Sequence, residues 1–342
     1  MLKIYISIIA LTVCSLPAQA DPQFHVGQRE YVFQDSARKR SLKTHVWYPI
    51  STKIKTSVVG GHGMFVPTIA AVNAEMEKAD KPYPVVLISH GSGGTAEKLF
   101  WLAGYLVEHG FVAIGVDSPG NMTLDNNGDG VVSQWVRALD STFALDRVAE
   151  LKEFKGKLDF SKIAAAGHSS GGTTVLLLAG ARMSSDRLTN PTPKCGGSKD
   201  PYAEKSCKEL KAINYKSYSK SVVEKDYADQ RVKAVVSLDP GLEASFDPAS
   251  FKTLRAKTLI LAAEKLAAPQ DEILSKDFAK LVSKDEFEIL PGSYHMTFLQ
   301  ACKPGVEFDD PELVVLCANG EKKLKLQQAT REKTLKFFKS NL

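Results

Sequence analysis

The chain has few cysteines, no long hydrophobic run and no strong excess of either charge. Its five cysteines include no C-x-x-C pair, and the spacings between them are wide for a metal site, which argues against zinc. An apolar run at residues 4–16 is shorter than the roughly 20 residues that cross a bilayer. The formal net charge of +5 is too mild to indicate binding to nucleic acid. The overall composition, with 44% hydrophobic and 24% charged residues, is that of an ordinary globular protein.

The N-terminus has the parts of a secretory signal peptide. Lys3 precedes the apolar run, and Ala18-Gln19-Ala20 provides the small residues of a cleavage site. We expect residues 1–20 to be removed, which leaves residues 21–342 as a single domain in the periplasm or outside the cell. With the leader gone, we expect no segment that integrates into a membrane.

Cleavage would also remove Cys14 and leave four cysteines in an oxidising compartment. Four cysteines allow three pairings. Two pairs are local in sequence and lie in loop-like stretches, which favours disulfides between Cys195 and Cys207 and between Cys302 and Cys317.

Strand-like and helix-like stretches alternate along most of the chain, which predicts an α/β fold with a mostly parallel, doubly wound sheet. Buried-strand patterns occur at residues 83–89, 111–117, 163–167, 232–238, 258–262 and 287–290. Helix-like stretches occur at residues 96–109, 132–155, 173–182, 271–282 and 323–340, and a short helix is expected at 69–78. Two earlier strands, at 31–33 and 43–49, predict an antiparallel N-terminal edge.

Residues 183–231 interrupt this alternation with two cysteines, two Asn/Thr-Pro turns and many lysines. We interpret them as an insertion that either caps the site or forms a solvated excursion without a role. The rest of the chain shows no internal repeat and no linker, which is the pattern of one domain.

The most informative stretch is residues 163–172, an apolar run that ends in G-x-S-x-G. It is followed by helix-like residues 173–182, so the motif has the strand-turn-helix context of a nucleophile elbow. Gly167 and Gly171 would let strand and helix approach closely, and Ser169 would be exposed in a strained turn. The alternative is a plain turn rich in glycine and serine.

A serine nucleophile needs a base, and the base needs a third group to orient it. His295 is the only histidine after Ser169, and it lies in a loop that follows a strand. Asp239 and Glu264 both follow strands between these two residues, and the sharp turn after Asp239 favours it as the acid. Glu264 is the alternative acid, and Asp271 is a weaker one that would also suit a helix cap.

An oxyanion hole needs two backbone donors. The N–H of Ser170, directly after the nucleophile, is the first candidate. The N–H of Ser92, in the glycine-rich loop after an earlier strand, is the second. We expect His90 to have a structural role in holding that loop.

Residues 125–130 match the opening of a calcium-binding loop, D-x-N-x-D-G. Val136 occupies the twelfth position, where a bidentate carboxylate should be. A polar turn is therefore favoured over a calcium site, and we expect neither a metal nor another cofactor.

Four stretches resemble the α/β-hydrolase superfamily: His90-Gly91-Ser92, Trp47-Tyr48-Pro49, the elbow at residues 167–172, and Ser237-Leu238-Asp239-Pro240. The likeness runs from about Tyr31 to the C-terminus except for the insertion. Within the superfamily, the chain looks most like the bacterial predicted dienelactone hydrolase group related to platelet-activating-factor acetylhydrolases.

The acetylhydrolase likeness implies that the acid follows the strand after the elbow, which supports Asp239. It also implies that an oxyanion donor follows His-Gly, which supports Ser92. True dienelactone hydrolases have a cysteine nucleophile, whereas Ser169 stands here.

The resulting hypothesis is a secreted or periplasmic serine carboxylic ester hydrolase that needs no cofactor. Its substrate would be a small-molecule or lipid ester, with short acyl chains, lipid-like acetyl esters and aromatic polyester fragments as possibilities. The alternatives are an acyltransferase or peptidase that uses the same triad, or a non-catalytic binding protein on a hydrolase scaffold.

Overall fold

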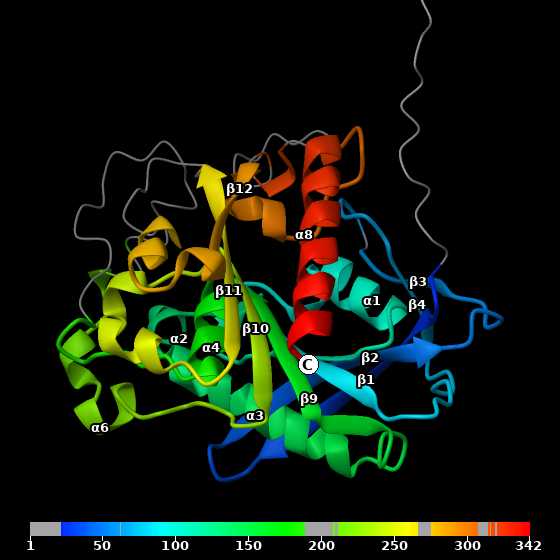
Figure 1. Ribbon diagram of the computed structural model, residues 1–342, viewed down its shortest axis with the longest axis horizontal. Helices are drawn as coiled ribbons and strands as arrows, with labels where there is room; N and C mark the ends of the chain where they lie inside the picture. The colour runs from blue at the N-terminus through cyan, green and yellow to red at the C-terminus, as the bar shows by residue number, and fades with distance from the viewer. Residues whose placement is uncertain are drawn as a thin grey trace, which may run out of the picture.

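A computed structural model describes residues 22–61, 63–188, 208, 211–265, 275–306, 314, 316–318 and 320–342. Within these residues, ten strands form one sheet in the order β12-β11-β10-β9-β5-β6-β2-β1-β4-β3 (Figure 1). The strands of this sheet are β1 (His25–Asp35), β2 (Arg40–Ile50), β3 (Ser57–Gly60), β4 (Thr68–Val72), β5 (Tyr83–Ser89), β6 (Val112–Asp117), β9 (Leu158–His168), β10 (Val232–Leu238), β11 (Lys257–Lys265) and β12 (Phe287–Tyr294). A separate small hairpin pairs β7 (Asn121–Met122) with β8 (Asp125–Asn126).

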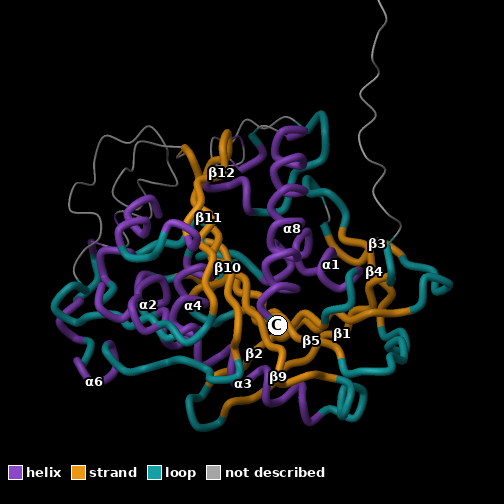
Figure 2. Tube along the Cα trace, viewed as in Figure 1, coloured by secondary structure: helices purple, strands orange, loops and turns teal. Residues whose placement is uncertain are grey.

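Helices cover both faces of the sheet (Figure 2). They are α1 (Phe100–Glu108), α2 (Gly128–Val132), α3 (Gln134–Glu150), α4 (Ser170–Ala179), α6 (Lys220–Val223) and α8 (Gly320–Asn341). Short 3-10 helices include η1 (Ala96–Leu99), η6 (Ser275–Lys280) and η8 (His295–Phe298). Among the helices in the described ranges, none has the length and apolar character of a membrane span.

The alternation of side chains along each strand divides the core into two layers. In β5, Val85 and Leu87 pack in the layer that contains the buried side chains of α3 and α4. Val86 and Ile88 point to the opposite layer, which contains those of α1 and α8. A strand buried on both faces has a continuous run of apolar residues, so the central strands can be predicted from the sequence.

The chain order of the strands places a topological switch point at β5. Strand β5 pairs in parallel with β6 on one side and with β9 on the other. The carboxyl end of β5 therefore lies beside that of β9, so the loop at residues 90–94 meets the turn at Ser169. Open α/β sheets bind ligands at such a point.

The predicted α/β fold is confirmed, with a mostly parallel sheet and antiparallel strands near the N-terminus. Strands β5, β6, β9, β10, β11 and β12 are parallel to their neighbours in that group. Strand β2 pairs antiparallel with β1 and with β6. The predicted hairpin is longer than expected, because pairing continues over all eleven residues of each strand.

The short helix predicted at residues 69–78 is wrong. Thr68–Val72 forms β4, which pairs with both β1 and β3. Backbone pairing with two neighbours outweighs the weak local preference of these five residues. The helix predicted at 271–282 is also different, since residues 275–280 form a 3-10 helix and residues 271–274 lie outside the described ranges.

The insertion at residues 183–231 is described only at 183–188, 208 and 211–231. Its α6 lies at the periphery of the molecule (Figure 1). The Tyr218 ring packs against that of Trp135 at 5.4 Å between centroids, and its hydroxyl donates to Asp129. These contacts attach the insertion to α2 and α3, and its role as a cap stays a prediction.

Candidate active site

Ser169 occupies the turn between β9 and α4, with φ 55° and ψ −120°. A positive φ is uncommon for residues other than glycine, and such positions cost about 1–3 kcal/mol each. Two glycines allow the close packing: a Cβ on Gly167 would lie 2.3 Å from the Gly171 carbonyl oxygen, and a Cβ on Gly171 would lie 1.9 Å from that of Ser89. The strained strand-to-helix turn expected from the motif is therefore present.

Asp239 follows the last residue of β10 and is 2% exposed. Its Oδ2 lies 2.6 Å from Nδ1 of His295. Its Oδ1 accepts hydrogen bonds from the Ala263 backbone N–H, at 2.9 Å, and from the Ser275 hydroxyl. Burial alone would raise the pKa of this carboxyl, but the hydrogen bonds from His295, Ser275 and Ala263 hold its pKa below the ordinary value. No sequence pattern marks Ser275 for this contact.

Glu264, the alternative acid, has a different set of contacts. Its Oε2 accepts a hydrogen bond from the Gly292 N–H at 2.8 Å, and its own N–H donates to the Ser293 hydroxyl at 3.2 Å. Glu264 thus holds the backbone that leads to His295, whereas Asp239 contacts the imidazole itself. Asp271 lies outside the described residues.

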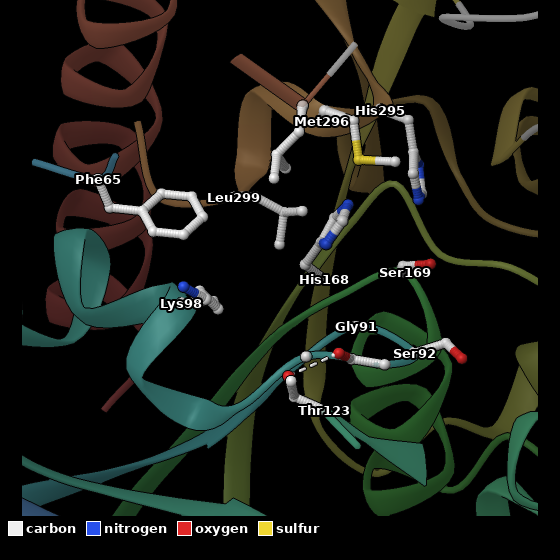
Figure 3. Close-up of a pocket in the computed structure, with 13 residues that line it drawn as sticks. Phe65, Gly91, Ser92, Lys98, Thr123, His168, Ser169, His295, Met296 and Leu299 are labelled. Carbon is white, nitrogen blue, oxygen red and sulfur yellow. Dashed lines mark hydrogen bonds between the residues drawn. The ribbon is translucent and has the colours of Figure 1, made fainter. Parts of the chain in front are cut away.

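Ser169 and His295 line one cavity of about 200 Å³, which is open to solvent. Figure 3 shows the Ser169 hydroxyl beneath the His295 ring, at the same end of this cavity. Apolar side chains form much of the remaining wall, namely Phe65, Met296, Leu299 and Leu316. The arrangement places a hydroxyl and an imidazole at the end of a mostly apolar cleft.

The two expected oxyanion donors are unpaired in the part of the chain that the structure describes. Helix α4 begins at Ser170, so the N–H groups of its first turn lack partners within the helix. Neither the Ser170 N–H nor the Ser92 N–H donates a hydrogen bond to another described residue. The positive end of the helix dipole adds to the attraction for a negative oxygen at this position.

A buried arginine fixes the loop that carries Ser92. Arg137, in α3, is 2% exposed and donates hydrogen bonds to the His90 carbonyl oxygen and to Asn121 Oδ1. Asn121 in turn donates from Nδ2 to Ser92 Oγ and to Asn126 Oδ1, both at 2.8 Å. Burial lowers the pKa of Arg137 to about 9. Hydrogen bonds from Arg137 and Asn121 thereby fix the position of the loop that offers the Ser92 N–H.

His90 is structural, as expected. Its Nδ1 lies 2.7 Å from the Gly91 carbonyl oxygen, and its Nε2 accepts a hydrogen bond from the Ser118 N–H at 3.2 Å. Complete burial lowers the pKa of His90 to about 3, so the ring is neutral. It links the loop after β5 to the residues after β6.

His168, directly before Ser169, is a second imidazole beside His295. The two ring centroids are 4.5 Å apart, and neither nitrogen of His168 has a hydrogen-bond partner among the described residues. Burial, and then the nearby His295, lower the pKa of His168 well below its ordinary value. His168 is therefore neutral and adds no positive charge next to His295.

The loop that resembles a calcium site uses its oxygens internally. Asp125 Oδ2 accepts from the Gly120 N–H at 2.7 Å, and Asn127 Oδ1 accepts from the Gly130 N–H at 2.8 Å. Asp129 Oδ1 accepts from the Tyr218 hydroxyl at 2.5 Å. Over the described ranges, no group of three or more His, Cys, Asp or Glu side chains is placed to hold a metal ion. These contacts favour the polar turn.

Cys302 and Cys317 form the predicted disulfide. Cys302 also pairs with Phe65 in an isolated β-bridge, and Cys317 directly follows Leu316. The disulfide thereby connects two segments that provide the apolar wall of the cavity. The other predicted pair, Cys195 with Cys207, lies outside the described residues.

Comparisons with known proteins show which proteins parts of this chain resemble. A family model described as PET hydrolase-like matches residues 46–194. Cutinase est1 of Thermobifida alba is 34% identical over 105 residues, which is 31% of this chain and 33% of the cutinase. Cutinase 2 of Thermobifida cellulosilytica is 34% identical over 107 residues, 31% of this chain and 37% of the relative. The chain thus spans about a third of the length of these cutinases.

The matched residues contain Ser92 and Ser169 but end before Asp239 and His295. The pairing of those two residues rests on the geometry of this chain alone.

A solved structure extends the comparison over the whole chain. The ferulic acid esterase from Streptomyces cinnamoneus covers 96% of this chain, and the match covers 92% of that esterase, with a TM-score of 0.56 and 20% sequence identity. At that identity the likeness concerns the fold. The chain has the α/β-hydrolase fold, and its residues 46–194 are similar to PET hydrolase-like proteins.

Proposed function

We propose that this protein is a serine carboxylic ester hydrolase. The observation that carries the proposal is the Asp239–His295 pair, 2.6 Å apart, at a cavity that Ser169 also lines from a strained turn. The similarity of residues 46–194 to PET hydrolase-like proteins and cutinases supports ester chemistry.

In the proposed mechanism, Ser169 Oγ attacks the ester carbonyl carbon while Nε2 of His295 takes its proton. Asp239 orients the ring through Nδ1 and stabilises the imidazolium. The N–H groups of Ser92 and Ser170 bind the oxyanion. His295 then protonates the leaving alcohol, and water attacks the acyl enzyme to release the acid and free Ser169.

The apolar wall of the cavity fits a small acyl group or one aromatic ring. Lipid-like acetyl esters, as in the acetylhydrolase-like group, and aromatic polyester fragments both suit this wall. We further propose that the mature protein works in the periplasm or outside the cell. The signal-like residues 1–20 and the Cys302–Cys317 disulfide support this location.

The first test is labelling of the purified mature protein with a fluorophosphonate probe, followed by a series of 4-nitrophenyl esters of increasing chain length. Wild type should label and hydrolyse short esters, Ser169→Ala should do neither, and Ser161→Ala, at an exposed serine, should match wild type. A folded wild-type protein that neither labels nor turns over any ester would point to a binding scaffold. Turnover of amides, or transfer to added alcohols in preference to water, would point to a peptidase or an acyltransferase.

A further inference from the structure

One lysine borders the cavity at a distance from the reacting groups. Among the described lining residues, Lys98 is the one with an ammonium, guanidinium or carboxylate group. It lies in η1, and Figure 3 shows it with Phe65 on the opposite side of the cavity from Ser169 and His295. Any substrate that fills the cavity from Ser169 would extend toward this ammonium group.

The structure provides an aromatic partner for Lys98 but, among the described residues, no carboxylate in direct contact with its ammonium group. Its Nζ lies 3.4 Å from the centroid of the Phe65 ring, a cation–π contact. The nearby carboxylate of Glu97 attracts the ammonium and acts to raise the pKa of Lys98, but it does not contact the ammonium directly, and its Oε1 accepts a hydrogen bond from the Gly61 N–H at 3.1 Å. Within the described residues, Lys98 forms no ion pair, in contrast to Lys43, Lys220, Lys280 and Lys333.

The burial of Lys98 makes this missing anion significant. The side chain is half-buried, and the desolvation of the ammonium lowers its pKa. A half-buried cation that no carboxylate contacts directly gains more from an arriving anion than a fully hydrated surface lysine does.

We propose that Lys98 forms a subsite for a carboxylate carried by the substrate. The substrate class is then an ester that bears a carboxylate on an apolar spacer, such as a half-ester of a dicarboxylic acid. Water cleaves the one ester bond through Ser169, which yields an alcohol and a dicarboxylate, while the free carboxylate stays unreacted against Lys98. Figure 3 shows the apolar side chains of Leu299 and Met296 between these two ends of the cavity, where the spacer would lie. This inference rests on the proposed esterase function.

The test compares two pairs of esters that differ only in one charge. In the first pair the carboxylate is on the acyl group: 4-nitrophenyl hydrogen suberate against 4-nitrophenyl methyl suberate. In the second it is on the leaving group: 4-acetoxybenzoate against methyl 4-acetoxybenzoate. For wild type, kcat/KM should be about tenfold higher for the charged ester in at least one pair, the effect of one charge-assisted contact. The 4-acetoxybenzoate has a poorer leaving group than its methyl ester, so kcat/KM for each ester of this pair is divided by the rate of its uncatalysed hydrolysis.

Three variants locate the preference. Lys98→Met keeps the length of the side chain without its charge, so it should remove the preference; the readout is the ratio of kcat/KM for the charged ester to that for its neutral partner within each pair. Lys98→Arg keeps a positive charge, so it should keep most of the preference for the charged ester. Lys336→Met, at an exposed position on α8, is the matched control and should behave as wild type.

Three results would overturn the proposed Lys98 subsite. Equal rates for charged and neutral esters in wild type overturn the subsite even if both esters are cleaved, and the proposed esterase function then still stands. A preference that survives in Lys98→Met also overturns it. A wild-type protein that cleaves no ester at all refutes the proposed function itself, and the subsite falls with it.

Discussion

Replacement of Asp239 by asparagine tests the proposed triad at its most constrained position. The carboxylate is buried, and both of its oxygens have partners. Oδ1 accepts a hydrogen bond from the Ala263 N–H at 2.9 Å. If the asparagine NH2 group took this position, its N–H would face the Ala263 N–H, and neither group could accept a hydrogen bond from the other. The asparagine carbonyl oxygen must therefore keep the Oδ1 position, and its NH2 group must face His295.

An NH2 group at 2.6 Å from Nδ1 can only donate to it, so His295 would hold its own proton on Nε2. In that tautomer the nitrogen that faces the serine carries a hydrogen and cannot accept the proton of Ser169. Loss of the correct tautomer in a serine triad lowers kcat by about 10⁴-fold, or about 5.5 kcal/mol of transition-state stabilisation. The substrate wall does not include Asp239, so KM should change little.

The assay is steady-state hydrolysis of 4-nitrophenyl butyrate, with near-UV circular dichroism to establish that the variant is folded. Glu264→Gln is the matched control, since glutamine keeps an oxygen for the Gly292 N–H and should retain most of the activity. The reverse ranking, with Asp239→Asn active and Glu264→Gln inactive, would refute the assignment of the acid to Asp239.

Three further changes probe the surroundings of the site. Arg137→Met should lower kcat by about 10²-fold with little change in KM, because the loop with the second oxyanion donor loses its anchor; an equal rise in KM would contradict a positioning role. Cys302→Ser should lower the free energy of unfolding by about 3 kcal/mol in urea titrations, since the disulfide closes a loop with a sequence separation of 15. Against the effect of burial, contacts with Asp117 and Glu30 raise the pKa of His45 to about 9. Its contribution to stability is complete below pH 6.5 and is lost as the pH rises toward 9, so the stability of wild type relative to His45→Gln should decline over that interval.

The sequence was sufficient to predict the central sheet because its strands are buried on both faces. Strand β5 illustrates this, since residues that alternate between two core layers must all be apolar. The turn at Ser169 was also predictable, because no residue larger than glycine fits at positions 167 and 171. In both cases, local sterics impose a local sequence pattern.

Other features depend on partners that are distant in the chain. Strand β4 exists because β1 and β3 pair with it, and no property of Thr68–Val72 alone requires a strand. The choice between Asp239 and Glu264 was open, because Asp239 follows β10 and Glu264 lies near the end of the neighbouring β11, and only their side-chain contacts separate them. Arg137 and Ser275 reach the site from a helix and a 3-10 segment that have no motif of their own.

The proposed chemistry and the proposed specificity rest on different parts of the fold. Ser169, Asp239 and Ser92 follow central strands, where neighbouring backbone fixes their positions. Phe65, which lines the cavity opposite Ser169, lies instead in residues 64–66. These pair with residues 301–303, through Val66 N–H to the Ala301 carbonyl oxygen at 2.8 Å and Lys303 N–H to the Met64 carbonyl oxygen at 2.7 Å. Phe65 in this pairing and Lys98 in η1 both lie outside the parallel strands, so a change at either residue can alter which ester fits without moving the Asp239–His295 pair.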